Sequence, residues 1–237
     1  MRLDHYLYAR HYTQSRNQAK ALILGQKVRV DGMIVTKPAL TLDPSRKYHI
    51  EILQDRLYVS RAAEKLKAFL TAHPIVVTGK RCLDIGSSTG GFVQVLLEMG
   101  ASEVTGVDVG TDQLHEMLRN DPRVISVEQT DIRDFKSDMP YELVTCDVSF
   151  TGVVHILPAI ERLAAKDIVL LFKPQFEVGK DAKRTKKGVV KDQKAIEAAM
   201  RRFEAEVAAI GWKTVVREPS RVKGKEGNAE IFYHFTK

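Results

Sequence analysis

The sequence predicts a doubly wound α/β domain preceded by a small α+β domain, and three observations lead to this expectation. From residue 80 onward, short apolar runs alternate with helical stretches. Each apolar run is nearly continuous, as in strands whose two faces are both covered by helices. The chain has 237 residues, enough for one ordinary domain and one small one. We therefore expect a mostly parallel, seven-stranded sheet with helices on both of its faces.

The first 55 residues form the expected small domain. One helical face in residues 14–24 carries Ala19, Leu22 and Ile23, and Gly25 follows it as a helix stop. Short strands are expected at three places around the turn signal Asp31-Gly32, namely 27–30, 35–38 and 48–52. A polar connector follows at 54–58. The predicted division is a first domain at 1–55, a linker at 56–59 and a second domain at 60–237.

The second domain shows a regular alternation of elements. The apolar runs expected to form parallel strands are 81–85, 103–109, 124–128, 143–148 and 167–172. The helices expected around them are 60–73, 91–99, 112–120, 153–165 and 193–210. Two final strands, 212–217 and 229–235, can close the sheet as an antiparallel pair.

Composition limits the class of protein. The net charge is +7, which is compatible with a polyanionic partner but does not establish one. Cys82 and Cys146 provide neither a disulfide framework nor a zinc site, so we expect two reduced core residues and no metal. Charged residues such as Arg2 and Asp4 interrupt the start of the chain, and no run approaches the roughly 20 apolar residues of a membrane helix. These features predict a cytoplasmic protein without a membrane partner.

A glycine-rich turn follows the first strand of the second domain, within residues 83–92. In open α/β sheets, ligands bind beyond the carboxyl ends of the strands. Glycines at such a turn let the backbone approach a ligand closely. The candidate ligand-binding residues at this edge are Asp84, Gly86, Ser87, Ser88, Gly90, Gly91, Phe92, Asp108, Val109, Asp131 and Ile132.

Two nucleotide-binding motifs are disfavoured at this turn. A nicotinamide fingerprint requires glycine where the chain has Ser88, and a P-loop requires a lysine after Gly90 or Gly91. Asp108 lies about 20 residues after the glycine turn, a spacing that suits a ribose hydroxyl contact. Asp131 is a candidate neighbour of an adenine ring, and Asp84 could offset a positive charge on the ligand. Alternatively, the glycines form only a turn and the carboxylates are solvated.

These residues resemble the S-adenosylmethionine site of Rossmann-like class I methyltransferases. Over nearly its whole length, the chain resembles the TlyA family of rRNA 2′-O-methyltransferases, which are often labelled haemolysins. Residues 2–32 resemble the alpha-L RNA-binding module of ribosomal protein S four. Further matching segments are 59–66, 147–150, 172–177 and 227–230. Two departures stand out: Ala62-Ala63 where the family has Gly-Gly, and a loop at 220–224 without the usual proline after Ser220.

The resemblance implies S-adenosylmethionine as cofactor and a catalytic tetrad of Lys65, Asp147, Lys173 and Glu230. It also implies transfer of a methyl group to a cytidine ribose in large-subunit (23S) rRNA, with small-subunit rRNA as a second candidate. The expected partner is rRNA or a ribosomal subunit, without an obligate protein partner. The chain starts directly at the RNA-binding module, so it resembles the shorter form of the family.

The chemistry explains why such residues are needed. A ribose 2′-hydroxyl is a poor acid, so a base helps to remove its proton, and lysine is a base only when neutral. We expect Lys173 to be that base and Asp147 to orient it, with Lys65 and Glu230 as positioning groups. Asp147 ends the fourth strand and Lys173 follows the fifth, so both are expected at one edge of the sheet.

Basic residues are the candidates for contact with the RNA backbone. In the small domain they are Arg10, Arg16, Lys20 and Arg29. In the large domain they are Lys183, Arg184, Lys186, Lys187, Arg221, Lys223 and Lys225. Three other functions compete: 5-methylcytosine formation with Cys146 as nucleophile, a non-catalytic rRNA-binding protein, and a membrane-active haemolysin. The first is disfavoured because Cys146 lies within a strand, the second because the cofactor turn and tetrad are intact, and the third because no membrane-active segment is visible.

Overall fold

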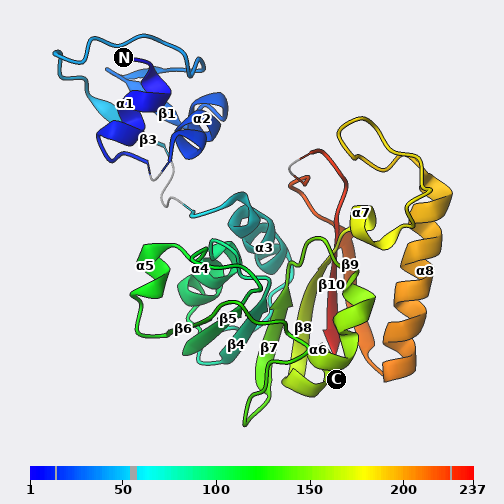
Figure 1. Ribbon diagram of the computed structural model, residues 1–237. Coiled ribbons are helices and arrows are strands. Elements are labelled where there is room, and N and C mark those ends of the chain that lie inside the picture. The colour runs from blue at the N-terminus through cyan, green and yellow to red at the C-terminus, as the bar shows by residue number, and fades with distance from the viewer. Residues whose placement is uncertain (14, 54–57, 225) are drawn as a thin grey trace. The chain divides into compact units, whose positions relative to one another are not determined.

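Two units make up the chain, Met1–Tyr58 and Val59–Lys237 (Figure 1). The computed structural model describes residues 1–13, 15–53, 58–224 and 226–237. Gln14, where the first helix is predicted to begin, and residues 54–57 of the predicted connector and linker lie outside the described residues.

The first unit combines two helices with a small antiparallel sheet. Its elements are α1 (Leu3–Ala9), α2 (Arg16–Leu24), β1 (Val28–Val30), β2 (Met33–Ile34) and β3 (Ile50–Ile52), and the strands lie in the order β2-β1-β3. Ser15 caps α2 by accepting a hydrogen bond from the backbone N–H of Gln18 at 3.1 Å. Helix α1 was not predicted, although Leu3 and Leu7, four residues apart, are both buried on one face. The predicted strand at 35–38 is wrong, because the chain reverses at Asp31-Gly32 and pairs at once through Met33–Ile34.

The second unit contains a single seven-stranded sheet. Its strands are β4 (Arg81–Ile85), β5 (Glu103–Val107), β6 (Val124–Val127), β7 (Tyr141–Cys146), β8 (Ala164–Phe172), β9 (Lys213–Pro219) and β10 (Ile231–Thr236). Its helices are α3 (Arg61–Ala72), α4 (Gly91–Glu98), α5 (Glu116–Arg119), η1 (Val153–Ile156), α6 (Leu157–Leu163), α7 (Pro174–Glu177) and α8 (Gln193–Ile210). The strand order is β6-β5-β4-β7-β8-β10-β9, in which β10 runs antiparallel to both β8 and β9. The predicted mostly parallel, seven-stranded sheet is confirmed.

Neighbouring residues of β10 show that helices cover both faces of the sheet. Successive side chains of a strand point to opposite faces. The ring of Phe232 stacks on Phe69 of α3 at 4.6 Å between centroids. The ring of Tyr233 packs edge-on against Phe203 of α8 at 5.1 Å. Helices α3 and α8 therefore lie on opposite faces (Figure 1).

Several predicted boundaries shift. Strands β5 and β7 end at Val107 and Cys146, so Asp108 and Asp147 come directly after their strands rather than within them. The helix predicted at 112–120 is only α5, and the one predicted at 153–165 divides into η1 and α6 before β8 begins at Ala164. Helix α7 was not predicted. Among the described residues, no helix is both long enough and apolar enough to cross a membrane.

Candidate active site

A cavity of about 470 Å³ lies beyond the carboxyl ends of β4, β5 and β7. This is where a ligand is expected in an open α/β sheet, and the size suits a small-molecule cofactor. The predicted cofactor residues that line it are Gly86, Ser88, Asp108, Val109, Asp131 and Ile132. Asp147 of the predicted tetrad lines the same cavity. The cavity therefore joins the predicted cofactor site to part of the predicted catalytic group.

Other residues of the glycine turn do not line the cavity but pack behind the turn. Gly90 has φ +93°, and a Cβ there would overlap the side chains of Leu114 and Leu118. A Cβ on Gly91 would overlap Ser60 Oγ, so this glycine lets α4 approach the start of α3. Phe92 is buried and contributes to the core rather than to the cavity wall. Ser87 is also buried, outside the cavity lining.

Asp84 lies directly behind the turn and is 1% exposed. Its Oδ1 accepts a hydrogen bond from the Thr145 hydroxyl at 2.7 Å, whereas its Oδ2 has no hydrogen-bond partner among the described residues. Burial raises the pKa of this carboxyl to about 7. A cationic ligand nearby would favour the ionised form of such a group.

Asp108 forms the wall that follows β5. Its carboxylate accepts hydrogen bonds from the backbone N–H of Ser88 at 2.8 Å and of Gly110 at 2.7 Å. The next residue, Val109, is 71% exposed and offers an apolar side chain to the cavity. Elsewhere in the cavity wall, Asp131 forms an ion pair with Arg133 at 2.6 Å. This contact lowers the pKa of Asp131 to about 2.

The charges of the cavity fit S-adenosylmethionine better than a pyrophosphate ligand. Its charged lining residues are Asp108, Asp131, Arg133 and Asp147. The guanidinium of Arg133 is already paired, so carboxylates dominate the wall. A diphosphate would be repelled there, whereas a cofactor with a sulfonium, an amine and a ribose diol finds acceptors and compensating charge. The residues present thus fit the cofactor that the sequence predicts.

The four residues of the predicted tetrad come together as two ion pairs. Lys65 Nζ lies 2.6 Å from Glu230 Oε2, and Lys173 Nζ lies 2.7 Å from Asp147 Oδ1. The topology explains the meeting, because Ile231 of the antiparallel β10 pairs with Phe172 at the end of β8. Glu230 therefore enters the sheet beside the point where Lys173 leaves it.

The tetrad is a nearly buried cluster of two positive and two negative groups. Burial raises the pKa of Asp147, and the neighbouring Lys173 and Lys65 oppose that effect. Lys173 also donates to Ser149 Oγ at 2.8 Å and to the Asp147 carbonyl oxygen at 3.4 Å. Its amine is thus surrounded by three acceptors, one of which, the Ser149 hydroxyl, can also donate.

Several residues at the site were not singled out individually from the sequence. Gln175 Nε2 donates to Glu230 Oε1 at 3.2 Å. Phe150 lines the cavity with its side chain 93% exposed and its backbone at φ +69°, an uncommon conformation for a bulky residue. Its ring centroid lies 5.5 Å from that of Phe176. All of these, with Ser149, lie two or three positions after Asp147 or Lys173 in sequence, which was the available signal.

Cys146 does not have the surroundings of a nucleophile. Its side chain is buried within β7, and burial raises the pKa of the thiol to about 12. A nucleophilic cysteine requires an accessible, readily ionised thiol. The structure therefore gives no support to 5-methylcytosine chemistry.

The predicted RNA-contact residues fall into two sets, one in each unit. In the first unit, Arg16 pairs with Asp4 at 3.2 Å and Arg29 with Glu51 at 3.3 Å, so part of their charge is balanced internally. Arg10 and Lys20 are exposed. In the second unit the exposed residues are Lys183, Arg184, Lys186, Lys187, Arg221 and Lys223, and Lys225 lies outside the described residues.

The two basic loops of the second unit are held next to the tetrad. Arg184 donates to the carbonyl oxygen of Gln175 at 3.0 Å. The backbone N–H of Val190 donates to Asn228 Oδ1 at 3.0 Å, which joins the first basic loop to the second. A polyanion that follows these loops would pass close to Glu230 and Lys173.

Comparison with known proteins agrees with this arrangement. Residues 58–237 match the FtsJ-like methyltransferase family, and residues 1–46 match the S4 domain. The chain is 45% identical to the 23S rRNA (cytidine-2′-O)-methyltransferase TlyA of Campylobacter jejuni over the whole of both proteins. It is 40% identical to the 16S/23S rRNA (cytidine-2′-O)-methyltransferase TlyA of Mycobacterium tuberculosis, over 98% of this chain and 88% of that one.

A solved structure from Streptococcus thermophilus, described as a candidate hemolysin, is similar over 100% of this chain and 88% of its own, with 32% identity and a TM-score of 0.74. The chain therefore belongs to the TlyA family, in which an S4 domain precedes an FtsJ-like methyltransferase domain.

Proposed function

We propose that the protein transfers a methyl group from S-adenosylmethionine to the ribose 2′-hydroxyl of a cytidine in 23S rRNA, with 16S rRNA as a second candidate substrate. The observation that carries the proposal is the ion pair between Lys173 and Asp147, since Asp147 lines the cavity. The names of the relatives from C. jejuni and M. tuberculosis support the choice of substrate. A ribosomal substrate would place the activity in the cytoplasm.

The residues around the cavity would hold the cofactor in a defined orientation. Asp108 would accept hydrogen bonds from the ribose hydroxyls, and Val109 and Ile132 would flank the adenine. Asp147, which lines the cavity, and Asp84, which is buried behind the turn, would balance the charge of the cationic end. When bound, the cofactor supplies a methyl group that is already activated by its attachment to a cationic sulfur.

The tetrad would prepare the nucleophile. Lys173, in its neutral form, would accept the proton of the 2′-hydroxyl, and Asp147 at 2.7 Å would hold the amine in place. Ser149 contacts the same amine and would help to orient it. Lys65 and Glu230 would act as positioning groups on the side of the basic loops.

Substrate binding would use both units. The S4 domain and the basic loops supply cations for the phosphate backbone, which makes binding sensitive to salt. The exposed ring of Phe150, which lies next to Phe176, offers an apolar surface on which an unstacked base could rest. Sequence selection would then depend on how the target nucleotide is brought to this ring.

One assay tests the proposal. Large subunits, small subunits and naked rRNA are incubated with cofactor labelled in its methyl group, and the modified nucleotide is mapped. The expected product is a 2′-O-methylcytidine in 23S rRNA. Label on a base or on protein contradicts the proposal. RNA binding without label would instead indicate a non-catalytic rRNA-binding protein, and lysis of membranes by the purified chain a haemolysin.

A further inference from the structure

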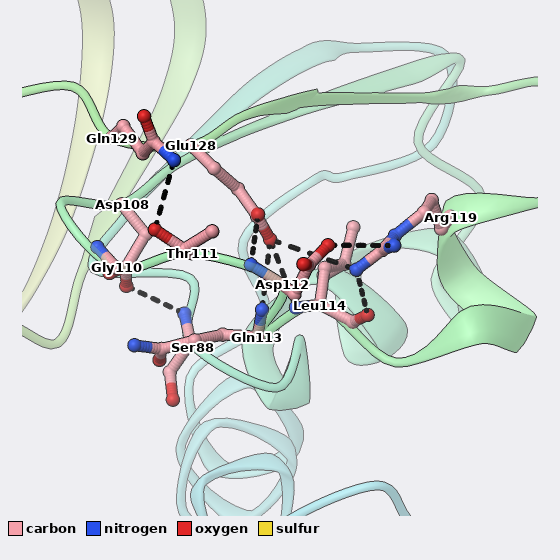
Figure 2. A network of polar contacts seen from close by, with 10 residues as sticks. All are labelled: Ser88, Asp108, Gly110, Thr111, Asp112, Gln113, Leu114, Arg119, Glu128 and Gln129. Carbon is pink, nitrogen blue, oxygen red and sulfur yellow. Dashed lines mark hydrogen bonds and ion pairs between the residues drawn. The ribbon is translucent and has the colours of Figure 1, made fainter.

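One carboxylate outside the predicted site accepts hydrogen bonds from three consecutive backbone N–H groups. Glu128 follows β6, and its side chain accepts hydrogen bonds from Asp112, from Gln113 at 3.1 Å and from Leu114 at 3.2 Å (Figure 2). Arg119 Nη2 lies 4.0 Å from the same carboxylate. These contacts lower the pKa of Glu128, with the bond from Leu114 as the largest cause. The carboxylate is therefore ionised under ordinary conditions.

The contacts explain why this segment is not the helix that its sequence predicts. Asp112 adopts φ +50°, in the left-handed region that costs energy for L-residues, although aspartate tolerates it better than most. Its N–H and the next two point at Glu128 instead of starting a helix. Helix α5 begins only at Glu116. A carboxylate from elsewhere in the chain thus holds the segment in an otherwise unfavourable conformation.

The segment held in this way forms part of the cavity wall. Gly110 and Gln113 both line the cavity. The Gln113 side-chain amide lies so close to Gly110 that a Cβ there would overlap it, and the Gly110 N–H donates to Asp108 (Figure 2). The position of Gln113 therefore affects the surroundings of the carboxylate proposed to bind the ribose.

The same segment also supports the glycine turn on the other side. Leu114 and Leu118 pack against Gly90, where a Cβ would overlap both side chains. The His115 N–H donates to the carbonyl oxygen of Thr89 at 3.3 Å. Residues 110–118 thus link the end of β6 to the turn after β4, and Gly86 and Ser88 of that turn line the cavity.

We propose that Glu128 is a positioning residue for the cofactor: it preorganises residues 110–114 as the wall that receives the adenosyl part. The inference rests on the proposed use of S-adenosylmethionine. A wall that is ordered before binding reduces the entropy lost on binding, so Glu128 contributes to affinity. It lies outside the tetrad and has no part in the methyl transfer itself.

The test compares Glu128→Ala and Glu128→Gln with a matched control, Glu116→Gln, which alters an exposed carboxylate on α5. S-adenosylhomocysteine affinity is measured by calorimetry, and methyl transfer to rRNA is measured at saturating cofactor. We expect Glu128→Ala to raise the Kd roughly tenfold and Glu128→Gln to raise it less, because the amide retains one acceptor oxygen. Glu116→Gln is expected to leave the Kd unchanged. The kcat and the rRNA affinity should stay close to wild type in all three variants.

Hydrogen exchange measures separately whether Glu128 orders residues 112–114. The amides of Asp112, Gln113 and Leu114 should exchange faster in both Glu128 variants than in Glu116→Gln. An unchanged Kd in Glu128→Ala, or a fall in kcat without a change in Kd, overturns the proposal. If the alanine variant does not fold, the glutamine variant decides by the same criteria. A wild-type chain that fails to bind S-adenosylhomocysteine would instead overturn the proposed function.

Discussion

Lys65 Nζ lies 2.6 Å from Glu230 Oε2 although 165 residues separate the two in sequence. The carboxylate is 3% exposed and the lysine 8% exposed. Gln175 also donates a hydrogen bond to Glu230. A Cβ on Gly224 would overlap the Glu230 carboxylate, so only glycine fits at position 224. A buried ion pair of this kind does little for stability overall, but each charge depends strongly on its partner.

Glu230→Gln is expected to destabilise the protein and to abolish methyl transfer. The change leaves the Lys65 ammonium buried without its counter-charge, which typically costs about 3–5 kcal/mol. Urea denaturation measures the loss in the free energy of unfolding, and the labelled-cofactor assay measures the activity. The double variant Lys65→Met with Glu230→Leu is the control, since it removes both charges. It should recover most of the stability while remaining inactive. Recovery of activity in the double variant would show that the pair serves stability alone.

Lys173→Arg separates charge from proton transfer. Arginine keeps the positive charge and can pair with Asp147, but it does not become neutral in proteins. We expect normal cofactor binding and a rate lowered by roughly 10²–10⁴, the range typical of a lost general base. Ser149→Ala, which leaves the ion pair in place, should lower the rate much less. A Lys173→Arg enzyme that works at the wild-type rate would reassign Lys173 from base to positioning group.

The sheet and the meeting of Asp147 with Lys173 could be predicted because both depend on regular features. Continuous apolar runs identified the parallel strands, and the topology rule brought Asp147 and Lys173 to one edge. That Lys65 and Glu230 belong with them followed only from family resemblance, since no local pattern links α3 with the start of β10.

The cavity wall was harder to predict because distant contacts decide it. Residues 112–115 have a helical pattern, but the N–H groups of Asp112, Gln113 and Leu114 donate to the Glu128 carboxylate. Phe92 belongs to the predicted glycine turn, yet its ring joins the core beside Phe232. For Phe150 the only signal was its position close to Asp147 in sequence, because no local pattern reveals that its backbone is left-handed and its ring exposed.

Phe150→Ala is expected to reduce rRNA methylation while leaving S-adenosylhomocysteine affinity unchanged. An exposed aromatic ring that supports a base contributes about 1–3 kcal/mol by alanine substitution. On the scale of about 1.4 kcal/mol per tenfold, we expect a loss in kcat/KM for rRNA of roughly fivefold to a hundredfold. Phe150→Tyr retains a ring of similar size and should keep most of the activity. Equal losses in both variants, or a weaker cofactor affinity in Phe150→Ala, would contradict a stacking role.

Asp84→Asn is expected to stabilise the cofactor-free protein at pH 8 but not at pH 4. In the folded chain, burial raises the pKa of Asp84 from 3.8 to about 7, so the folded state favours the protonated carboxyl. The stability from that protonation is fully present below about pH 4 and is lost as the pH rises through 7. At pH 8 the wild type carries a buried anion that costs up to about 4 kcal/mol. Asparagine stays neutral and keeps an oxygen for the Thr145 hydroxyl.

Cofactor binding should favour the ionised form of Asp84, whereas the cofactor-free fold favours the protonated form, because a cationic ligand stabilises the ionised carboxyl. Wild-type affinity for S-adenosylmethionine is therefore expected to rise between pH 6 and pH 8, with release of a proton on binding. Asp84→Asn should bind more weakly and without this pH dependence. Denaturation at pH 4 and pH 8 and calorimetry across the pH range measure the two effects. A variant less stable than wild type at pH 8 but not at pH 4 would show that the Asp84 anion has a partner in the folded chain. If the variant is also the stronger binder, the charge of Asp84 is not what retains the cofactor.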